Sequence, residues 1–174
     1  NSICDEWLKS LSAPEGTLGE SQLFSRKSLS NIGFPVKQNE KWKLTSLKRL
    51  EKILSLPVEV TLDKIDGDSY NKNLPKKYND SLRIDLNSSL ESISKMYLPK
   101  GIRKLTESEL KDKLKNSNRK DFNVLINNAA AKQVLALEIS GKTHHSLEII
   151  IKGKSDKLIA TRVILFIEES SKLD

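Results

Sequence analysis

The stretch Gln133–Ile167, "QVLALEISGKTHHSLEIIIKGKSDKLIATRVILFI", carries the strongest fold signal of this chain. It contains three apolar, β-branched runs that begin at Gln133, Ser146 and Leu158, 13 and 12 residues apart, with a glycine in each gap. β-Branched residues suit the pleated surface of a strand. Short strands at this interval predict a meander, a sandwich or a β-solenoid.

The last of these runs is the most hydrophobic, and a short polar tail follows it. An apolar strand without a neighbour presents unpaired backbone groups to other chains. We therefore expect that the natural protein continues beyond Asp174. We also expect this chain to self-associate through the edge near Val163 to Ile167.

The first third of the chain is predicted to be helical, and the middle mixes short helices with strands. Apolar residues at helical spacing predict helices over residues 3–11, 18–32, 45–54, 107–114 and 121–131. Alternating residues predict strands over 58–62 and 82–86. The expected N-terminal caps are Thr45 or Ser46, Asp121, and a reciprocal capping box between Thr106 and Glu109.

The net charge of +7 is concentrated in the middle of the 174 residues. Between Lys95 and Lys120 there are nine Lys and Arg against three Asp and Glu, a surplus of six. Between Lys37 and Lys52 there are six against two, a surplus of four. Basic patches attract nucleic acid or anionic membrane. Because the longer run contains only one aromatic residue on which a base could stack, Tyr97, we interpret it as a solvated surface.

The sequence predicts a cytoplasmic chain without a membrane segment. No apolar run approaches the ~20 residues that cross a bilayer, and the first thirty residues lack the apolar region of a signal peptide. The single cysteine, Cys4, allows no intrachain disulfide.

No residues form a convincing catalytic, cofactor-binding or metal site. Cys4 is the only thiol, and the two histidines, His144 and His145, are adjacent in a predicted hairpin turn. Two ligands are too few for a structural zinc site. Neither GxxxxGK[ST] nor GxGxxG occurs. We expect no enzyme activity and no bound metal, although a small enzyme using Cys4 or the histidines stays an alternative.

The polar connector "GFPVKQNEKWKLTSL", Gly33 to Leu47, holds one of only two tryptophans, Trp42. Trp supplies a large apolar area. Two interpretations are open: the ring packs against the helices on either side, or it is exposed for a partner. A connector without its own core needs an anchor, so we expect Trp42 to be largely buried.

This connector resembles the N-terminal signature of the SufB/SufD family of iron–sulfur cluster assembly scaffolds, its SufD-like members in particular. The matching residues are Gly33, Pro35, Lys37, Glu40, Trp42, Lys43, Thr45 and Leu47. The chain departs from the pattern at Leu44, where the family usually has an aromatic residue. The resemblance continues in order through "LPKGIRKLTESEL" and "DFNVLINNAAAKQVLALEISGKTHHSLEIII".

The resemblance implies the N-terminal portion of a longer SufD-like protein with an α+β fold. Residues 1–131 would form a mostly helical domain with some strands, and residues 132–174 the first rungs of a right-handed β-helix. The implied function is scaffolding, without catalysis or a resident cofactor, together with SufB-like subunits and the SufC-like ATPase. The alternative is a basic nucleic-acid-binding or other protein-interaction module.

Overall fold

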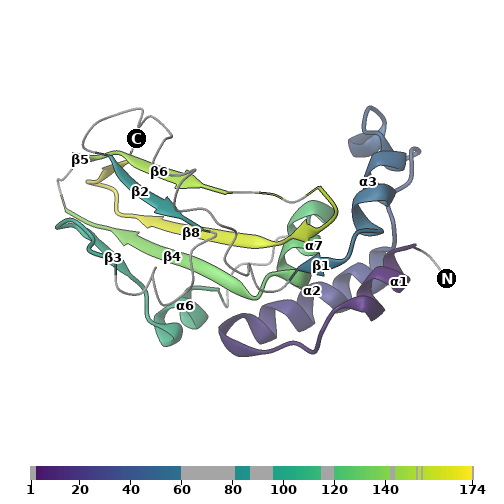
Figure 1. Cartoon of the computed structure of the whole chain (residues 1–174), viewed down its shortest axis with the longest axis horizontal. Helices are drawn as coiled ribbons and strands as arrows, with labels where there is room; N and C mark the ends of the chain where they lie inside the picture. Colours follow the sequence, from purple (N-terminus) through teal and green to yellow (C-terminus); the bar gives the residue numbers. More distant parts are fainter. Residues whose placement is uncertain are drawn as a thin grey trace. The chain divides into compact units, whose positions relative to one another are not determined.

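The computed structural model describes residues 3–59, 81–86, 96–114, 120–141, 144–151, 153 and 155–173. The helical elements are α1 (Ile3–Ser10), η1 (Gly16–Leu18), α2 (Gly19–Ile32), η2 (Glu40–Trp42), α3 (Leu47–Leu54), α6 (Glu107–Leu114) and α7 (Phe122–Ala130), of which η1 and η2 are short 3-10 turns. The strands are β1 (Val58–Glu59), β2 (Leu82–Asp85), β3 (Ile102–Lys104), β4 (Gln133–Ile139), β5 (His144–His145), β6 (Leu147–Ile150), β7 (Leu158–Ile159), β8 (Thr161–Ile167) and β9 (Lys172–Leu173) (Figure 1). The fold is therefore α+β, as predicted.

The chain divides into two compact units, each assembled from three segments. Unit 1 comprises Asn1–Val60, Leu110–Lys132 and Gly153–Arg162, and unit 2 comprises Thr61–Glu109, Gln133–Lys152 and Val163–Asp174. Each unit has its own cluster of buried apolar side chains. The chain leaves unit 1 after Lys132 and enters unit 2 at Gln133. The division of the whole chain into residues 1–131 and 132–174 stays a prediction.

In unit 1, two polar side chains of α2 donate hydrogen bonds to backbone carbonyls at the C-terminal end of α7. Arg26 donates from Nε and Nη2 to the carbonyl oxygen of Ala129, at 3.1 and 3.0 Å. The buried Gln22 donates from Nε2 to the carbonyl of Ala131 at 2.7 Å. The last carbonyls of a helix lack intrahelical donors, and a cation there interacts favourably with the helix dipole. These bonds link α2 to α7. They also compensate for the burial of the Gln22 side-chain amide.

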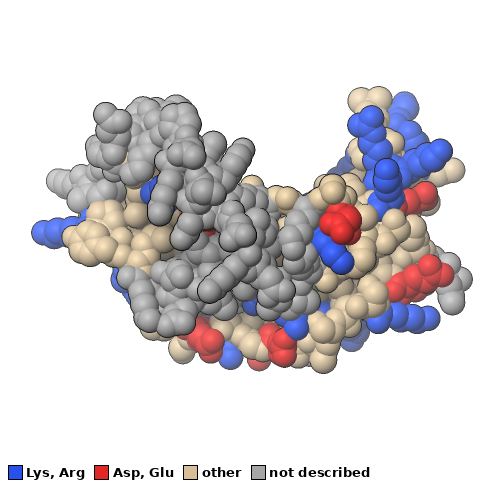
Figure 2. Space-filling model, viewed as in Figure 1, with Lys and Arg blue, Asp and Glu red and all other residues tan. Residues whose placement is uncertain are grey.

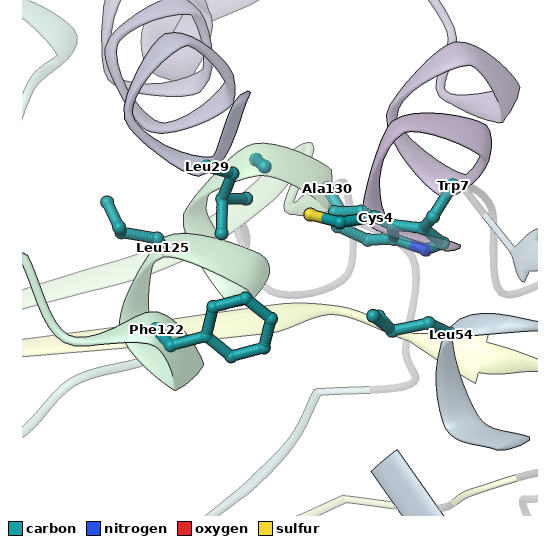
Figure 3. Close-up of a cluster of buried hydrophobic side chains, with 8 residues drawn as sticks. Cys4, Trp7, Leu29, Leu54, Phe122, Leu125 and Ala130 are labelled. Atoms are coloured by element: carbon teal, nitrogen blue, oxygen red, sulfur yellow. The ribbon is translucent and has the colours of Figure 1, made fainter. Parts of the chain in front are cut away.

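The core of unit 1 gathers apolar side chains from four helices. Its buried members are Cys4, Trp7, Leu29, Leu54, Phe122, Leu125, Ala129 and Ala130 (Figure 3). In α3, Ile53 has the same helical spacing as Leu50 and Leu54, but it is 44% exposed. Only Leu50 and Leu54, four residues apart on one face, turn toward the core because the contact face of this short helix is narrow.

In unit 2, the strand β4 lies between β3 and β8 (Figure 1). Leu135, Leu137 and Ile139 alternate along β4 and are buried in the core of this unit. The intervening Glu138 pairs in register with Arg103 of the antiparallel β3. The alternation follows from the two-residue period of a strand, which places Glu138 on the opposite face from the three buried side chains.

The remaining described strand pairs are parallel. Strand β2 pairs with β6, β1 with β7, and β5 with β9. The runs at Gln133, Ser146 and Leu158 thus do not form a meander among the described strands, because β6 pairs with β2 rather than with β4. The β-helix itself stays a prediction.

Two strands differ from the predictions, and a third is described only in part. The predicted strand 158–167 is divided at Ala160, because β7 pairs with β1 while β8 joins β4. Strand β3 was not predicted, because three residues carry no pattern of their own and are ordered by pairing with β4. The strand predicted over 58–62 is seen as β1, and its remaining residues lie outside the described ones.

The predicted capping box at the start of α6 is confirmed. The backbone N–H of Thr106 donates to Glu109 Oε2 at 2.8 Å, and the N–H of Glu109 donates to Thr106 Oγ1 at 3.3 Å. Arg103 Nη1 also donates to Glu109 Oε1 at 2.9 Å. The backbone N–H of Thr106 first, then its hydroxyl and Arg103, lower the pKa of Glu109 from 4.5 to about 2.

Glu109→Gln should therefore destabilise the chain near neutral pH, and the effect should fade in acid. Between pH 4.5 and about 2 the unfolded state binds more protons than the folded state, so the free energy of unfolding rises with pH in that window. The stabilisation by the carboxylate is complete above pH 4.5 and is lost as the pH falls through about 2. Urea melts of both proteins across this range measure the difference.

The matched control is Glu107→Gln, which removes the same charge from the same helical turn without touching the capping box. A difference between Glu109→Gln and the unsubstituted protein that stays constant down to about pH 2 would contradict the assignment, because the folded-state pKa would then not be lowered.

Candidate interaction surface

The connector between α2 and α3 has a defined fold. Gly33 ends α2 with a φ of 68°, a left-handed conformation that favours glycine, and its N–H donates to the carbonyl of Leu29 at 2.9 Å. Asn39 then caps η2, because its side chain accepts a bond from the N–H of Lys41 at 3.1 Å. The polar connector thus begins at the glycine cap of α2 and contains the capped 3-10 turn η2.

Trp42 and Phe34 fasten this connector to the first residue of α7. The ring centroids of Trp42 and Phe122 lie 5.6 Å apart at 88°, and those of Phe34 and Phe122 lie 6.0 Å apart at 86°. Both pairs have the edge-to-face geometry that aromatic rings prefer. The predicted packing role of Trp42 is confirmed, because the ring packs against the unit 1 core.

The prediction did not identify the partner of this ring. Trp42 packs at the margin of the core cluster and stays partly exposed. Its aromatic partner, Phe122, belongs to α7 rather than to either helix flanking the connector. The contact could not be predicted from local patterns, because the two residues lie far apart in the sequence.

Two of the predicted helix caps make no side-chain bond. Asp121 occupies the N-cap position of α7, but its carboxylate lies 3.8 Å from Lys41 Nζ instead. Ser46 occupies the N-cap of α3 and contributes only its carbonyl, which accepts from the N–H of Arg49 at 3.1 Å. The Lys41–Asp121 pair is mostly exposed, so it stabilises the connector only weakly.

The outer side of the connector and of α3 is basic. Its exposed Lys and Arg side chains are Lys37, Lys41, Lys43, Lys48, Arg49 and Lys52. Figure 2 shows Lys and Arg side chains gathered over the region of α3. Among them lies Leu44, which is 98% exposed. The connector thus packs Trp42 against the unit 1 core and leaves its lysines, Val36 and Leu44 exposed.

Cys4 lies in the core of unit 1 and is fully buried. Burial raises the pKa of its thiol, and the negative charge of Asp5 raises it further. Because the thiolate is the reactive form, this environment opposes a nucleophilic role.

His144 and His145 form the strand β5, so the predicted hairpin turn was wrong. They pair in parallel with Lys172 and Leu173, a contact that the local sequence pattern could not supply. Within the described ranges, no group of three or more His, Cys, Asp or Glu side chains could hold a metal ion.

No family model, curated protein or solved structure matches this chain. Among the described helices, none combines the length and apolarity needed to span a bilayer.

Proposed function

We propose that this chain is the N-terminal portion of a SufD-like scaffold subunit, which acts in the cytoplasm within an iron–sulfur cluster assembly complex. Its partners would be a SufB-like subunit and a SufC-like ATPase. The observation that carries the proposal is the connector motif. Gly33 ends α2 and Trp42 packs on Phe122, so residues of the resemblance have specific structural roles.

The parallel strand pairs support the fold part of the proposal. In a β-helix, each strand pairs in parallel with a strand of the next turn, and β2–β6, β1–β7 and β5–β9 have this direction. Strand β8 ends the described order β3-β4-β8. The proposal includes pairing of its edge, Val163 to Ile167, with a further strand or a second copy.

The proposal assigns no catalytic step and no resident cofactor to this chain. An iron–sulfur cluster is usually held by about four thiolates, whereas this chain has the single buried Cys4. The cluster would be the product of the complex, and ATP hydrolysis would belong to the SufC-like subunit.

Co-expression with the SufB-like and SufC-like subunits of the same genome tests the proposal. The chain should elute with both subunits in size-exclusion chromatography, and light scattering should give the mass of a complex containing all three. An unrelated protein of similar pI controls for attraction by charge alone. Elution of the chain by itself, while the other two subunits associate, would refute the proposal.

The alternative function is nucleic-acid binding, which the net charge of +7 allows. Such binding depends steeply on salt, because phosphate contacts release counterions. Fluorescence anisotropy with duplex and single-stranded oligonucleotides at about 150 mM salt discriminates between the two functions. Retained binding would support the alternative, and its loss would support the scaffold.

A further inference from the structure

The position of Leu44 is set by the folded turn that precedes it. The N–H of Lys43 donates to the carbonyl of Glu40 at 3.2 Å, and the N–H of Thr45 donates to the carbonyl of Trp42 at 3.0 Å. Trp42 is itself fixed by its edge-to-face contact with Phe122. Leu44, between these bonds, is 98% exposed. A large apolar side chain is therefore held in water by an ordered backbone.

The residues that follow this leucine in the connector and in α3 are rich in positive charge. From Lys43 to Ile53 the chain has four Lys and Arg against one Glu, a surplus of three. We call the exposed side chains of Lys43, Leu44, Lys48, Arg49 and Lys52 the Leu44 surface. Among the described residues, none of these four cations has an ion-pair partner. Their charge is thus available to an anionic partner.

A nucleic acid fits this surface poorly. Binding of single strands relies on aromatic rings on which bases stack. The one aromatic residue of the region, Trp42, packs its ring onto Phe122. The exposed leucine offers no hydrogen-bond donor to phosphates, so it would add nothing to such binding.

A membrane surface also fits poorly. Interfacial helices bury a broad apolar face among the acyl chains. In α3 the apolar residues Leu50 and Leu54 pack into the unit 1 core instead. Leu44, with the 44% exposed Ile53, is too little apolar area to anchor a chain on lipid.

We propose that the Leu44 surface is a docking site for a partner protein that presents acidic side chains around an apolar pocket. Protein interfaces typically combine an apolar centre with a polar rim, and opposite charges select the partner and its orientation. Leu44 supplies the centre, and the four cations supply the rim. This inference does not depend on the proposed scaffold function.

The test uses two synthetic peptides as probes. The first is rich in Glu and carries a central Leu–Phe pair, and the second has this pair replaced by Ser. Anisotropy titrations with the full chain at about 150 mM salt should show tighter binding of the Leu–Phe peptide. Leu44→Ser should weaken that binding about tenfold, the order expected for an apolar side chain, and should leave the Ser peptide unchanged.

Charge and position are tested by matched variants. Lys48→Glu/Arg49→Glu should weaken binding of both peptides. The controls Leu23→Ser and Lys27→Glu, at exposed positions of α2, should change neither. Thermal melts of each variant verify folding, which an exposed residue such as Leu44 should not affect.

Three results would overturn the inference. The first is equal binding of both peptides with no effect of Leu44→Ser, which would leave only a solvated basic surface. The second is tighter binding of oligonucleotides, or of vesicles of phosphatidylcholine and phosphatidylserine, than of either peptide. The third is binding of no probe.

Discussion

Phe122→Ala is expected to lower the free energy of unfolding by about 3–5 kcal/mol, the range for a buried Phe replaced by Ala. Phe122 is 6% exposed and makes edge-to-face contacts with both Phe34 and Trp42. Its loss opens a cavity at the point where the connector meets α7. Urea unfolding followed by tryptophan fluorescence measures the loss, because Trp7 and Trp42 both belong to the unit 1 cluster.

The same substitution at an exposed site is the control. Phe24 on α2 is 42% exposed, so Phe24→Ala should cost under about 1 kcal/mol. A double-mutant cycle with Trp42→Ala should give a coupling of about 0.5–1.5 kcal/mol for the ring pair. A cost for Phe122→Ala no larger than that of Phe24→Ala would show that the ring does not support the core.

Local patterns predicted the helices well because a helix is encoded by nearby residues. The apolar spacing of residues 3–11 corresponds to α1, and the capping box located the start of α6 at Glu107. Glycine with positive φ explains why α2 ends before Gly33. In each case the determining residues lie within a few positions of one another.

Contacts between distant segments could not be predicted in the same way. Strand β2 pairs with β6, more than sixty residues away, and no alternation within either strand specifies its partner. The buried Gln22 has the same origin, because its amide is stabilised by Ala131 and by the backbone of Glu15. Composition alone would place a glutamine at the surface.

The candidate surface was predicted only in part. The sequence identified Trp42 as an anchor, because a tryptophan in a polar connector needs an apolar contact. It also marked Leu44 as the departure from the resembling motif. The full exposure of Leu44 depends on the turn bonds at Lys43 and Thr45 and on the ring of Phe122, which are contacts of the folded chain.

The second large effect is expected in unit 2, at the ion pair between β2 and β6. Arg83 donates from Nε and Nη2 to Glu148 Oε2, at 2.8 and 2.6 Å, and Ser81 Oγ donates to Glu148 Oε1 at 2.7 Å. The two charged side chains are only 15% and 19% exposed. Arg83→Met should cost about 3–5 kcal/mol, because the largely buried Glu148 carboxylate then loses both bonds from the Arg83 guanidinium.

Removing both charges should cost much less than removing one. When a buried ion pair is replaced by apolar residues of similar size, stability is often unchanged or improved. Arg83→Met/Glu148→Leu should therefore recover most of the loss of Arg83→Met in urea melts followed by circular dichroism. Because Arg83 lies opposite Glu148 in the parallel register, the pair also selects this alignment of β2 and β6 over one shifted by a residue. If the double variant is no more stable than Arg83→Met, the stability lost in Arg83→Met does not arise from the Glu148 carboxylate.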